Sequence, residues 1–242
     1  MALEKITGIV IDIVRHNDRS NVVSLYTRTR GRMSFVSPTG SGKSGRMKKA
    51  RLMPLSVVES EINFHNNREL QTLGSVIPAR IWRDIYFNPV KAAISIFLSE
   101  FLNRYLRDSS PDPNTFDFIV DSISFLDCIQ EGTANFHIWF LTSFLHFAGI
   151  MPDLSQLERG DVFDMRAGIP VAEIPNHRDY LSYAETAFLP ILARMKPSNL
   201  RFYKFSGSER RGILNMLLRY YAIHFPGTAN LRSLDVLTEL FS

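Results

Sequence analysis

The first 80 residues alternate between apolar and polar positions over short runs, which is the period of β-strands. Residues 6–14 read ITGIVIDIV, residues 21–38 hold two apolar runs around a turn at Arg30-Gly31, and residues 55–64 read LSVVESEINF. Residues 68–79, RELQTLGSVIPA, supply a fifth run. Five short strands separated by turn signals predict a small closed β-barrel at residues 1–80.

The period changes after residue 88, where Asn88-Pro89 has the form of a helix cap followed by a first-turn proline. Ala93, Ile96, Phe97, Phe101 and Tyr105 fall on one helical face. The remaining chain favours helices at 89–107, 113–131, 134–148, 179–195, 208–224 and 231–241. Residues 150–177 are irregular, and VFDMRAGIPVAEI within them is compatible with a small hairpin. The pattern predicts an α+β protein with domains at 1–80 and 81–242.

Composition limits the class of protein. Hydrophobic residues make up 45% of the 242 residues, enough for a core, and no apolar run approaches the ~18 residues of a membrane span. The N-terminus reads as a strand, not a signal peptide. The single cysteine, Cys128, excludes an internal disulfide and a thiol zinc cluster, as expected in a reducing cytoplasm.

Charge is distributed unevenly along the chain. Residues 1–80 carry 13 Lys and Arg against 6 Asp and Glu, a net of +7, whereas residues 81–242 carry a net of −3. Between Asp18 and Glu59 there is no acid, and that span holds nine basic residues: Arg19, Arg28, Arg30, Arg32, Lys43, Arg46, Lys48, Lys49 and Arg51. A long basic stretch without carboxylates indicates a polyanion partner, although it also suits a solvated charged surface.

The segment GSGKS at 40–44 resembles the end of a phosphate-binding P-loop. The motif requires glycine where Ser37 stands, and it requires an amphipathic helix after the loop. SGRMKKARLMP has little apolar face and meets Pro54, so we expect a flexible loop in which Gly40, Gly42 and Gly45 present lysines and arginines. FDFIVDS at 116–122, the candidate magnesium-binding segment, lies in a helical pattern.

The rest of the sequence shows no convincing group of catalytic or metal-binding residues. The six histidines are scattered, Cys128 lies among apolar residues, and Asp161 and Asp164 are more typical of loop charges than of a metal pair. Three aromatic residues of the barrel, Tyr26, Phe35 and Phe64, are candidates for base stacking if they face outward.

Several segments in order resemble the RecO recombination-mediator family. They are TGIVIDIVRHNDRSNVVSLYTRTRGRMSFVSPTG, GSGKSGRMKKARLMPLSVVE, AISIFLSEFLNRYLRDSSPDPNTFDFIVDSISFLD, FHIWFLTSFLHFAGIMPDL and LRSLDVLTELF. The resemblance covers nearly the whole chain. It implies an N-terminal five-stranded OB-type β-barrel followed by an all-helical C-terminal domain.

One departure concerns metal. Many members of the family carry a four-cysteine zinc knuckle after a Pro-x-Leu sequence, here Pro152 to Leu154, and no cysteine pair follows it in this chain. We therefore expect an irregular, metal-free insertion at about 150–177 and assign neither metal nor cofactor.

The resemblance implies a non-enzymatic, cytoplasmic and nucleoid-associated protein of DNA repair and recombination, without membrane attachment. Such proteins bind single- and double-stranded DNA, anneal complementary strands, and work with RecR to load RecA onto gaps coated by single-stranded-DNA-binding protein (SSB). The helical domain is implied to hold the acidic, apolar C-terminal tail of SSB.

Two sets of candidate site residues follow, and no catalytic residue is among them. The expected DNA-binding set is Arg28, Arg30, Arg32, Lys43, Arg46, Lys48, Lys49 and Arg51. A second basic cluster, which suits either DNA or the tail, is Arg194, Lys196, Arg201, Lys204, Arg210 and Arg211. An RNA-binding barrel protein and, less favoured, a P-loop nucleotide hydrolase are the alternatives.

Overall fold

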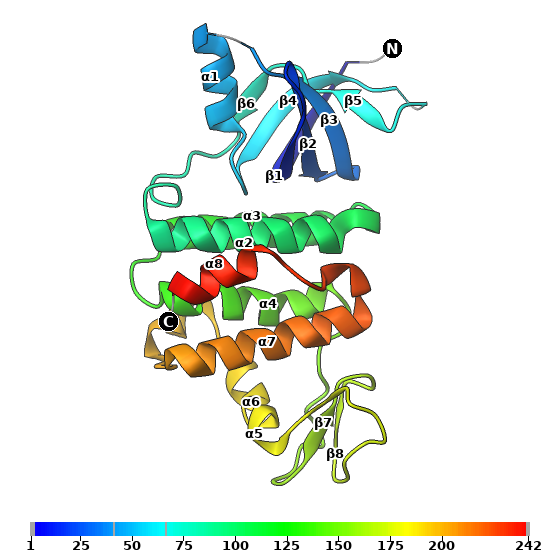
Figure 1. Cartoon of the computed structure of the whole chain (residues 1–242), viewed down its shortest axis with the longest axis vertical. Coiled ribbons are helices and arrows are strands. Elements are labelled where there is room, and N and C mark those ends of the chain that lie inside the picture. The colour runs from blue at the N-terminus through cyan, green and yellow to red at the C-terminus, as the bar shows by residue number, and fades with distance from the viewer. Residues whose placement is uncertain (1–2, 41, 66, 241–242) are drawn as a thin grey trace. The chain divides into compact units, whose positions relative to one another are not determined.

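The structure is a computed structural model that describes residues 3–40, 42–65 and 67–240 (Figure 1). It divides into two compact units, Met1–Cys128 and Ile129–Ser242. In the described residues the first contains a β-sheet with three α-helices and a short 3-10 helix, and the second is mainly helical. The predicted α+β class is confirmed.

The first unit is built on a sheet for which the described residues supply six strands, in the order β5-β3-β2-β1-β4-β6. The strands are β1 (Leu3–Asn17), β2 (Ser20–Thr27), β3 (Gly31–Pro38), β4 (Val57–Asn63), β5 (Leu70–Thr72) and β6 (Val76–Pro78). Neighbours are antiparallel except β3 and β5, which are parallel.

The prediction of a closed five-stranded barrel is wrong. Residues 68–79 form two strands instead of one, and β5 pairs with β3 while β6 pairs with β4 at the opposite edge of the sheet. Gly74 lies between them, so close to β4 that a Cβ would stand 2.4 Å from the Glu61 carbonyl oxygen. One short segment therefore crosses from edge to edge, and within the described residues β5 and β6 do not pair.

The middle of strand β1 is buried on both faces. Ile6 and Val10 join the sheet core, which also contains Val23, Leu25, Phe35, Leu52, Val58, Ile62, Leu73 and Val76. Ile9 and Ile11 alternate with them and are buried as well. Helix α2 (Pro89–Tyr105) approaches β1 there, since the Ser99 hydroxyl donates to the Ile11 carbonyl oxygen at 2.8 Å.

The long helices lie where the sequence pattern places them. They are α2, α3 (Pro113–Cys128), α4 (Phe136–Phe147), α7 (Gly207–His224) and α8 (Ser233–Leu240). The Asn88-Pro89 cap is confirmed, because the Asn88 side-chain oxygen accepts from the Val90 and Lys91 amides. Ser206 and Glu209 form a capping box at the start of α7.

The predicted helix at 179–195 is wrong. Tyr180–Leu181 form strand β9, and two short helices follow, α5 (Tyr183–Thr186) and α6 (Leu189–Leu192). Pro190 has no N–H to donate, so it is tolerated only in the first turn of α6 and one long helix cannot form through it.

The second unit is not all-helical. Strands β7 (Val162–Asp164), β8 (Ile169–Val171) and β9 form a small sheet in the order β8-β7-β9 among the described residues. The hairpin expected at 162–174 is confirmed by the β7–β8 pairing. The sheet is tied to α7, because the His224 Nε2 atom lies 2.9 Å from the Met165 carbonyl oxygen.

Candidate nucleic-acid interface

Helix α1 (Gly42–Arg51) carries the densest group of cations in the first unit. Arg46 and Lys49 are three residues apart, which places them on one face of the helix, and both are exposed. Neither forms an ion pair with a carboxylate in the described part of the chain. This pair is therefore available to an anion in solution.

Lys48 and Arg51 lie on another face of α1 and fasten the helix to the sheet. The Lys48 Nζ atom donates to the Leu73 carbonyl oxygen at 3.4 Å, and the Arg51 Nη1 atom donates to the Val76 carbonyl oxygen at 2.6 Å. Burial lowers the pKa of Lys48. These two cations bind the backbone on either side of the turn that joins β5 to β6, so they orient α1, which lies beside β6 in Figure 1.

The expectation of a flexible loop around Gly40, Gly42 and Gly45 is wrong, because Gly42–Arg51 form helix α1. α1 has no broad apolar face, yet two cations anchor it to carbonyl oxygens and Leu52, immediately after it, is buried in the sheet core. Gly45 packs against the Gly40 carbonyl oxygen, where a Cβ would stand only 1.7 Å away. The backbone of Lys43 belongs to α1, and its side chain lies outside the part of the chain that the structure describes.

Helix α1 does not meet the requirements of a P-loop, because it begins at Gly42, within GSGKS, and has no broad apolar face. Ser37 still stands in place of the first glycine, and FDFIVDS lies in α3, as predicted, instead of at the end of a strand. Its aspartates therefore do not occupy the position of a magnesium-binding carboxylate.

The other predicted DNA-binding arginines are engaged within the first unit. Arg28 donates twice to Asp117, at 3.0 and 2.8 Å, and Arg30 binds Glu4 while lying 3.9 Å from the centroid of the Phe64 ring. The hydrogen bond from Arg30 lowers the pKa of Glu4, and that from Arg28 lowers the pKa of Asp117. An acid-free stretch of sequence is thus not an acid-free surface.

Arg32 is also held internally, because it donates to the Asn103 side-chain oxygen at 3.1 and 3.0 Å and to the Ser24 hydroxyl at 3.3 Å.

Two of the three aromatic residues proposed for base stacking, Tyr26 and Phe35, do not face outward. Tyr26 and Phe35 are fully buried, and Tyr26 donates its hydroxyl to the Asp112 carbonyl oxygen at 3.3 Å. Burial raises the pKa of Tyr26 to about 12. Phe64 is half-buried beneath Arg30. Stacking of bases on Tyr26 or Phe35 is therefore excluded.

The second predicted cluster separates into two groups in the helical unit. Arg194, Lys196, Arg201 and Lys204 lie on or beside the short helix η3 (Pro197–Phe202), and all four are exposed. Arg210 and Arg211 lie in the first turns of α7.

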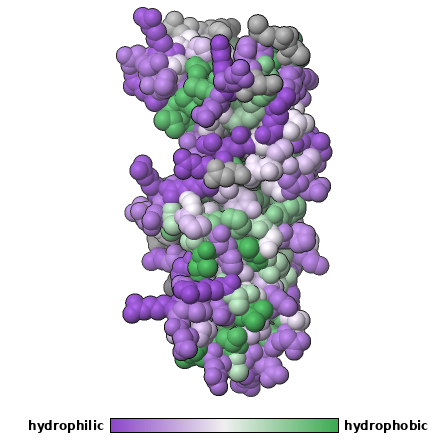
Figure 2. Space-filling model, turned by 90° about the vertical axis from the view of Figure 1, so that its right-hand side faces the viewer, coloured by the Kyte–Doolittle hydropathy of each residue, from purple (hydrophilic) through white to green (hydrophobic). Residues whose placement is uncertain are grey.

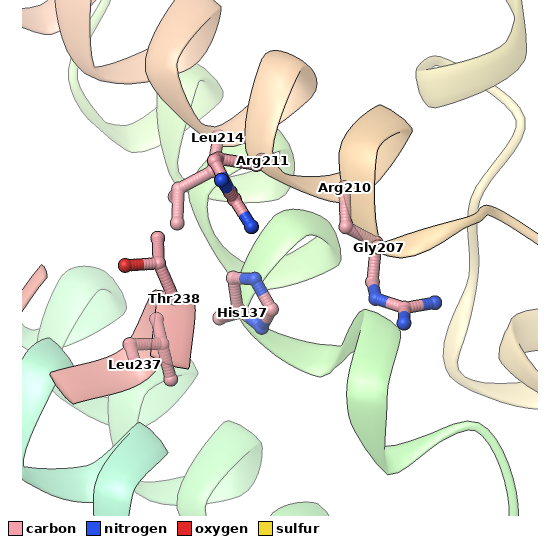
Figure 3. A pocket seen from close by; sticks show the side chains of 7 residues that line it. All are labelled: His137, Gly207, Arg210, Arg211, Leu214, Leu237 and Thr238. Atoms are coloured by element: carbon pink, nitrogen blue, oxygen red, sulfur yellow. The ribbon is translucent and has the colours of Figure 1, made fainter. Parts of the chain in front are cut away.

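Arg210 and Arg211 line a small pocket of the second unit (Figure 3). Leu214 of α7, His137 of α4, and Leu237 and Thr238 of α8 complete it with Gly207. In Figure 3 the Arg211 side chain points toward the His137 ring. Burial, followed by the charge of Arg210, lowers the pKa of His137 to about 3, so the ring is neutral at pH 7. The pocket combines cationic and apolar groups.

Hydrogen bonds and aromatic packing hold the segment at 150–177 in place. The Asp164 carboxylate accepts from the Arg166 and Ala167 amides and lies 3.4 Å from His177, while Phe163 is buried against the Tyr220 ring. The described residues contain no group of three or more His, Cys, Asp and Glu side chains placed to hold a metal ion.

Figure 2 shows that hydrophilic side chains cover most of the face turned to the viewer, with apolar colour broken into several small areas. Among the described residues, no helix combines the length and apolarity that crossing a membrane requires.

The fold and the candidate interface define a class: a two-unit α+β protein whose N-terminal sheet carries a basic helix. Two family models cover most of the chain, Recombination protein O N terminal over residues 1–82 and Recombination protein O C terminal over residues 87–235. The chain belongs to the RecO family of DNA repair and recombination proteins, which confirms the resemblance.

Curated relatives are similar along the full length. The DNA repair protein RecO of Phocaeicola vulgatus is 34% identical over 243 residues, covering 99% of this chain and 100% of that protein. Those of Bacteroides fragilis and Porphyromonas gingivalis are 33% and 31% identical, covering 99% and 97% of both chains.

Sequence reasoning missed Phe202, the last residue of η3, which lines an open pocket with Arg201 and Lys204. The signal was present, because NLRFYKFSGSERR interleaves aromatic residues with cations. Which of its aromatics is exposed depends on packing.

Proposed function

We propose that this chain is a non-enzymatic mediator of DNA repair and recombination that binds single- and double-stranded DNA and anneals complementary strands. Support comes from one observation above all: α1 is fastened by Lys48 and Arg51, while Arg46 and Lys49 remain exposed without a carboxylate partner in the described residues. Fixed cations reduce the repulsion between two polyanions, and annealing needs no nucleophile or metal.

The proposal extends to partners. The chain works with RecR and assists RecA loading on gaps coated by SSB, in the cytoplasm at the nucleoid. We assign the acidic, apolar C-terminal tail of SSB to the Arg210–Arg211 pocket. The Arg211 guanidinium suits a carboxylate, and Leu214 and Leu237 suit an apolar side chain, while Arg210 donates to the Phe205 carbonyl oxygen.

The test compares the unaltered protein with an Arg46→Gln/Lys49→Gln variant. Binding to a fluorescent single strand is measured by anisotropy over a range of salt concentrations, and annealing of complementary strands is followed with and without added SSB. The variant should bind several-fold more weakly, anneal more slowly, and lose about 0.7 from the salt slope for each lost phosphate contact.

The control is Arg159→Gln/Arg178→Gln, which removes the same charge from two exposed arginines of the helical unit. Equal losses in both variants would mean that net charge alone matters and that α1 is not the contact. A matched RNA strand separates the alternative: tighter binding to RNA than to DNA would make this an RNA-binding protein.

A further inference from the structure

Phe202 places its ring in water at the end of η3, where 66% of the residue is exposed. The neighbouring aromatic residues are packed against one another. Tyr203 and Phe205 stack at a centroid distance of 5.8 Å, and the Phe188 ring packs edge-on against Phe205 at 6.3 Å. The adjacent aromatics pack the turn, so exposure of Phe202 does not come from a loosely packed segment.

The backbone beneath Phe202 is held firmly. The Asn135 side-chain amide donates to the carbonyl oxygens of Leu200 and Tyr203, at 3.1 and 2.8 Å. Gly132 has a φ of +80° and approaches so closely that a Cβ there would lie 2.7 Å from the Arg201 amide nitrogen. The exposed ring therefore sits on a preorganised support, which reduces the entropy lost when a ligand binds.

One cation lies against the ring, and a second lines the same pocket. The Arg201 guanidinium carbon lies 4.8 Å from the Phe202 ring centroid. Arg201, Phe202 and Lys204 line an open pocket of about 580 Å³ together with Glu131 and Gly132.

Glu131 balances these charges only weakly. Its carboxylate lies 3.7 Å from Arg201 Nη1, and both side chains are more than half exposed, so the pair is screened by solvent. Lys204 forms no ion pair with a carboxylate in the described part of the chain.

Two more cations lie on the same turn. Asn199 of η3 holds the residues that precede the helix. Its side chain accepts from the Lys196 amide at 2.7 Å and donates to the Arg194 carbonyl oxygen at 3.0 Å. Both basic side chains are exposed. The segment 194–204, which contains η3, thus carries four exposed cations and one exposed aromatic ring.

We propose that Phe202 is a stacking platform for one unpaired base of a single strand, whose flanking phosphates are met by Arg201 and Lys204. A flat ring with adjacent guanidinium and ammonium groups matches the π-face and backbone charge of an unpaired nucleotide. A duplex hides its base faces, so the ring selects single strands over duplexes, whereas the cations serve both. This inference rests on the proposed DNA binding and adds a second contact, in the helical unit.

The test uses the full chain and three variants, Phe202→Ala, Phe202→Trp and Tyr183→Ala. Tyr183 is the control because it is an exposed aromatic, at 53%, in the same unit. Anisotropy with an oligothymidine strand and with a duplex of equal length gives the affinities. Phe202→Ala should weaken single-strand binding about fivefold or more and leave duplex binding nearly unchanged.

Phe202→Trp should retain single-strand affinity, and its fluorescence should be quenched by the strand because the indole stacks on a base. Tyr183→Ala should behave like the unaltered protein.

The outcomes separate the two proposals. If the unaltered protein binds the single strand and Phe202→Ala binds it equally well, the stacking site is wrong while the proposed function stands. If the unaltered protein binds neither DNA, the proposed function itself fails. If Phe202→Ala loses binding to an acidic peptide and not to the strand, the turn is a protein-docking site and this inference is overturned.

Discussion

Asp127, near the end of α3, organises the segment that follows the sheet. Its carboxylate accepts hydrogen bonds from the amides of Arg83, Asp84 and Ile85 at 2.8 to 3.0 Å. Its backbone carbonyl accepts from the buried Lys91 ammonium at 2.9 Å, and Lys91 also pairs with Asp84 at 2.7 Å. A buried charge that loses such partners is costly.

Burial raises the pKa of Asp127. The three amide hydrogen bonds and the charge of Lys91 together lower it by more than burial raises it, so the net shift is downward. A depressed pKa in the folded state stabilises the protein above the unfolded value of about 3.9, and this contribution is lost as pH falls through the folded value.

Replacing Asp127 with Asn should therefore lower the free energy of unfolding by about 1.5–3 kcal/mol at pH 7. The difference from the unaltered protein should begin to shrink below about pH 4, where the aspartate is protonated in the unfolded chain, and should disappear once pH falls below the lower pKa of the folded state. Urea unfolding at pH 7 and pH 3 measures both, with Asp121→Asn, an exposed position of the same helix, as control. A difference that stays constant across pH would rule out the carboxylate as its source.

At the scale of elements, helix α1 is stabilised by its contacts with the sheet and not by an apolar face of its own. Its sequence has cations in the last turn, which suit the negative end of the helix dipole, but no apolar stripe. Lys48 and Arg51 supply polar anchors, Leu52 supplies the apolar one, and Gly45 lets the preceding segment pack against the first turns.

Gly45→Ala should loosen α1, because the new Cβ would stand 1.7 Å from the Gly40 carbonyl oxygen and the two backbones must separate. We expect a loss of about 1–3 kcal/mol in local stability. Hydrogen exchange of the amides in Gly42–Arg51 should become faster, and single-strand binding should weaken with it. Gly212→Ala is the control: it has open space in α7, where alanine should be neutral or stabilising. Unchanged exchange in Gly45→Ala would contradict the packing role.

At the scale of the molecule, the two proposed DNA contacts belong to different units, α1 to the first and Phe202 to the second. Changes at sites that share no partners add in free energy. Combining Arg46→Gln/Lys49→Gln with Phe202→Ala should give a loss of binding free energy equal to the sum of the separate losses, within about 0.3–0.5 kcal/mol. Anisotropy of the four proteins on one oligonucleotide measures this, and a combined loss no larger than either single loss would show that a strand uses only one contact at a time.

Local sequence patterns alone were enough to predict the fold class and most of the long helices. The α+β order, the Asn88-Pro89 cap, the long helices and the β7–β8 hairpin depend on periodicity and caps within a few residues, so they were readable from the sequence. The family was readable as well, from the order of several diffuse motifs.

Only the tertiary structure decided which strands meet and which cations stay accessible. Residues 68–79 look like one strand, and their division between two edges depends on Gly74 passing close to β4. In the sequence, Arg28 and Arg30 have no acidic neighbour. In the fold, Arg28 pairs with Asp117, 89 residues away, and Arg30 pairs with Glu4, 26 residues away. Exposure and ion pairing are properties of long-range contacts, and no count of charges along a segment contains them.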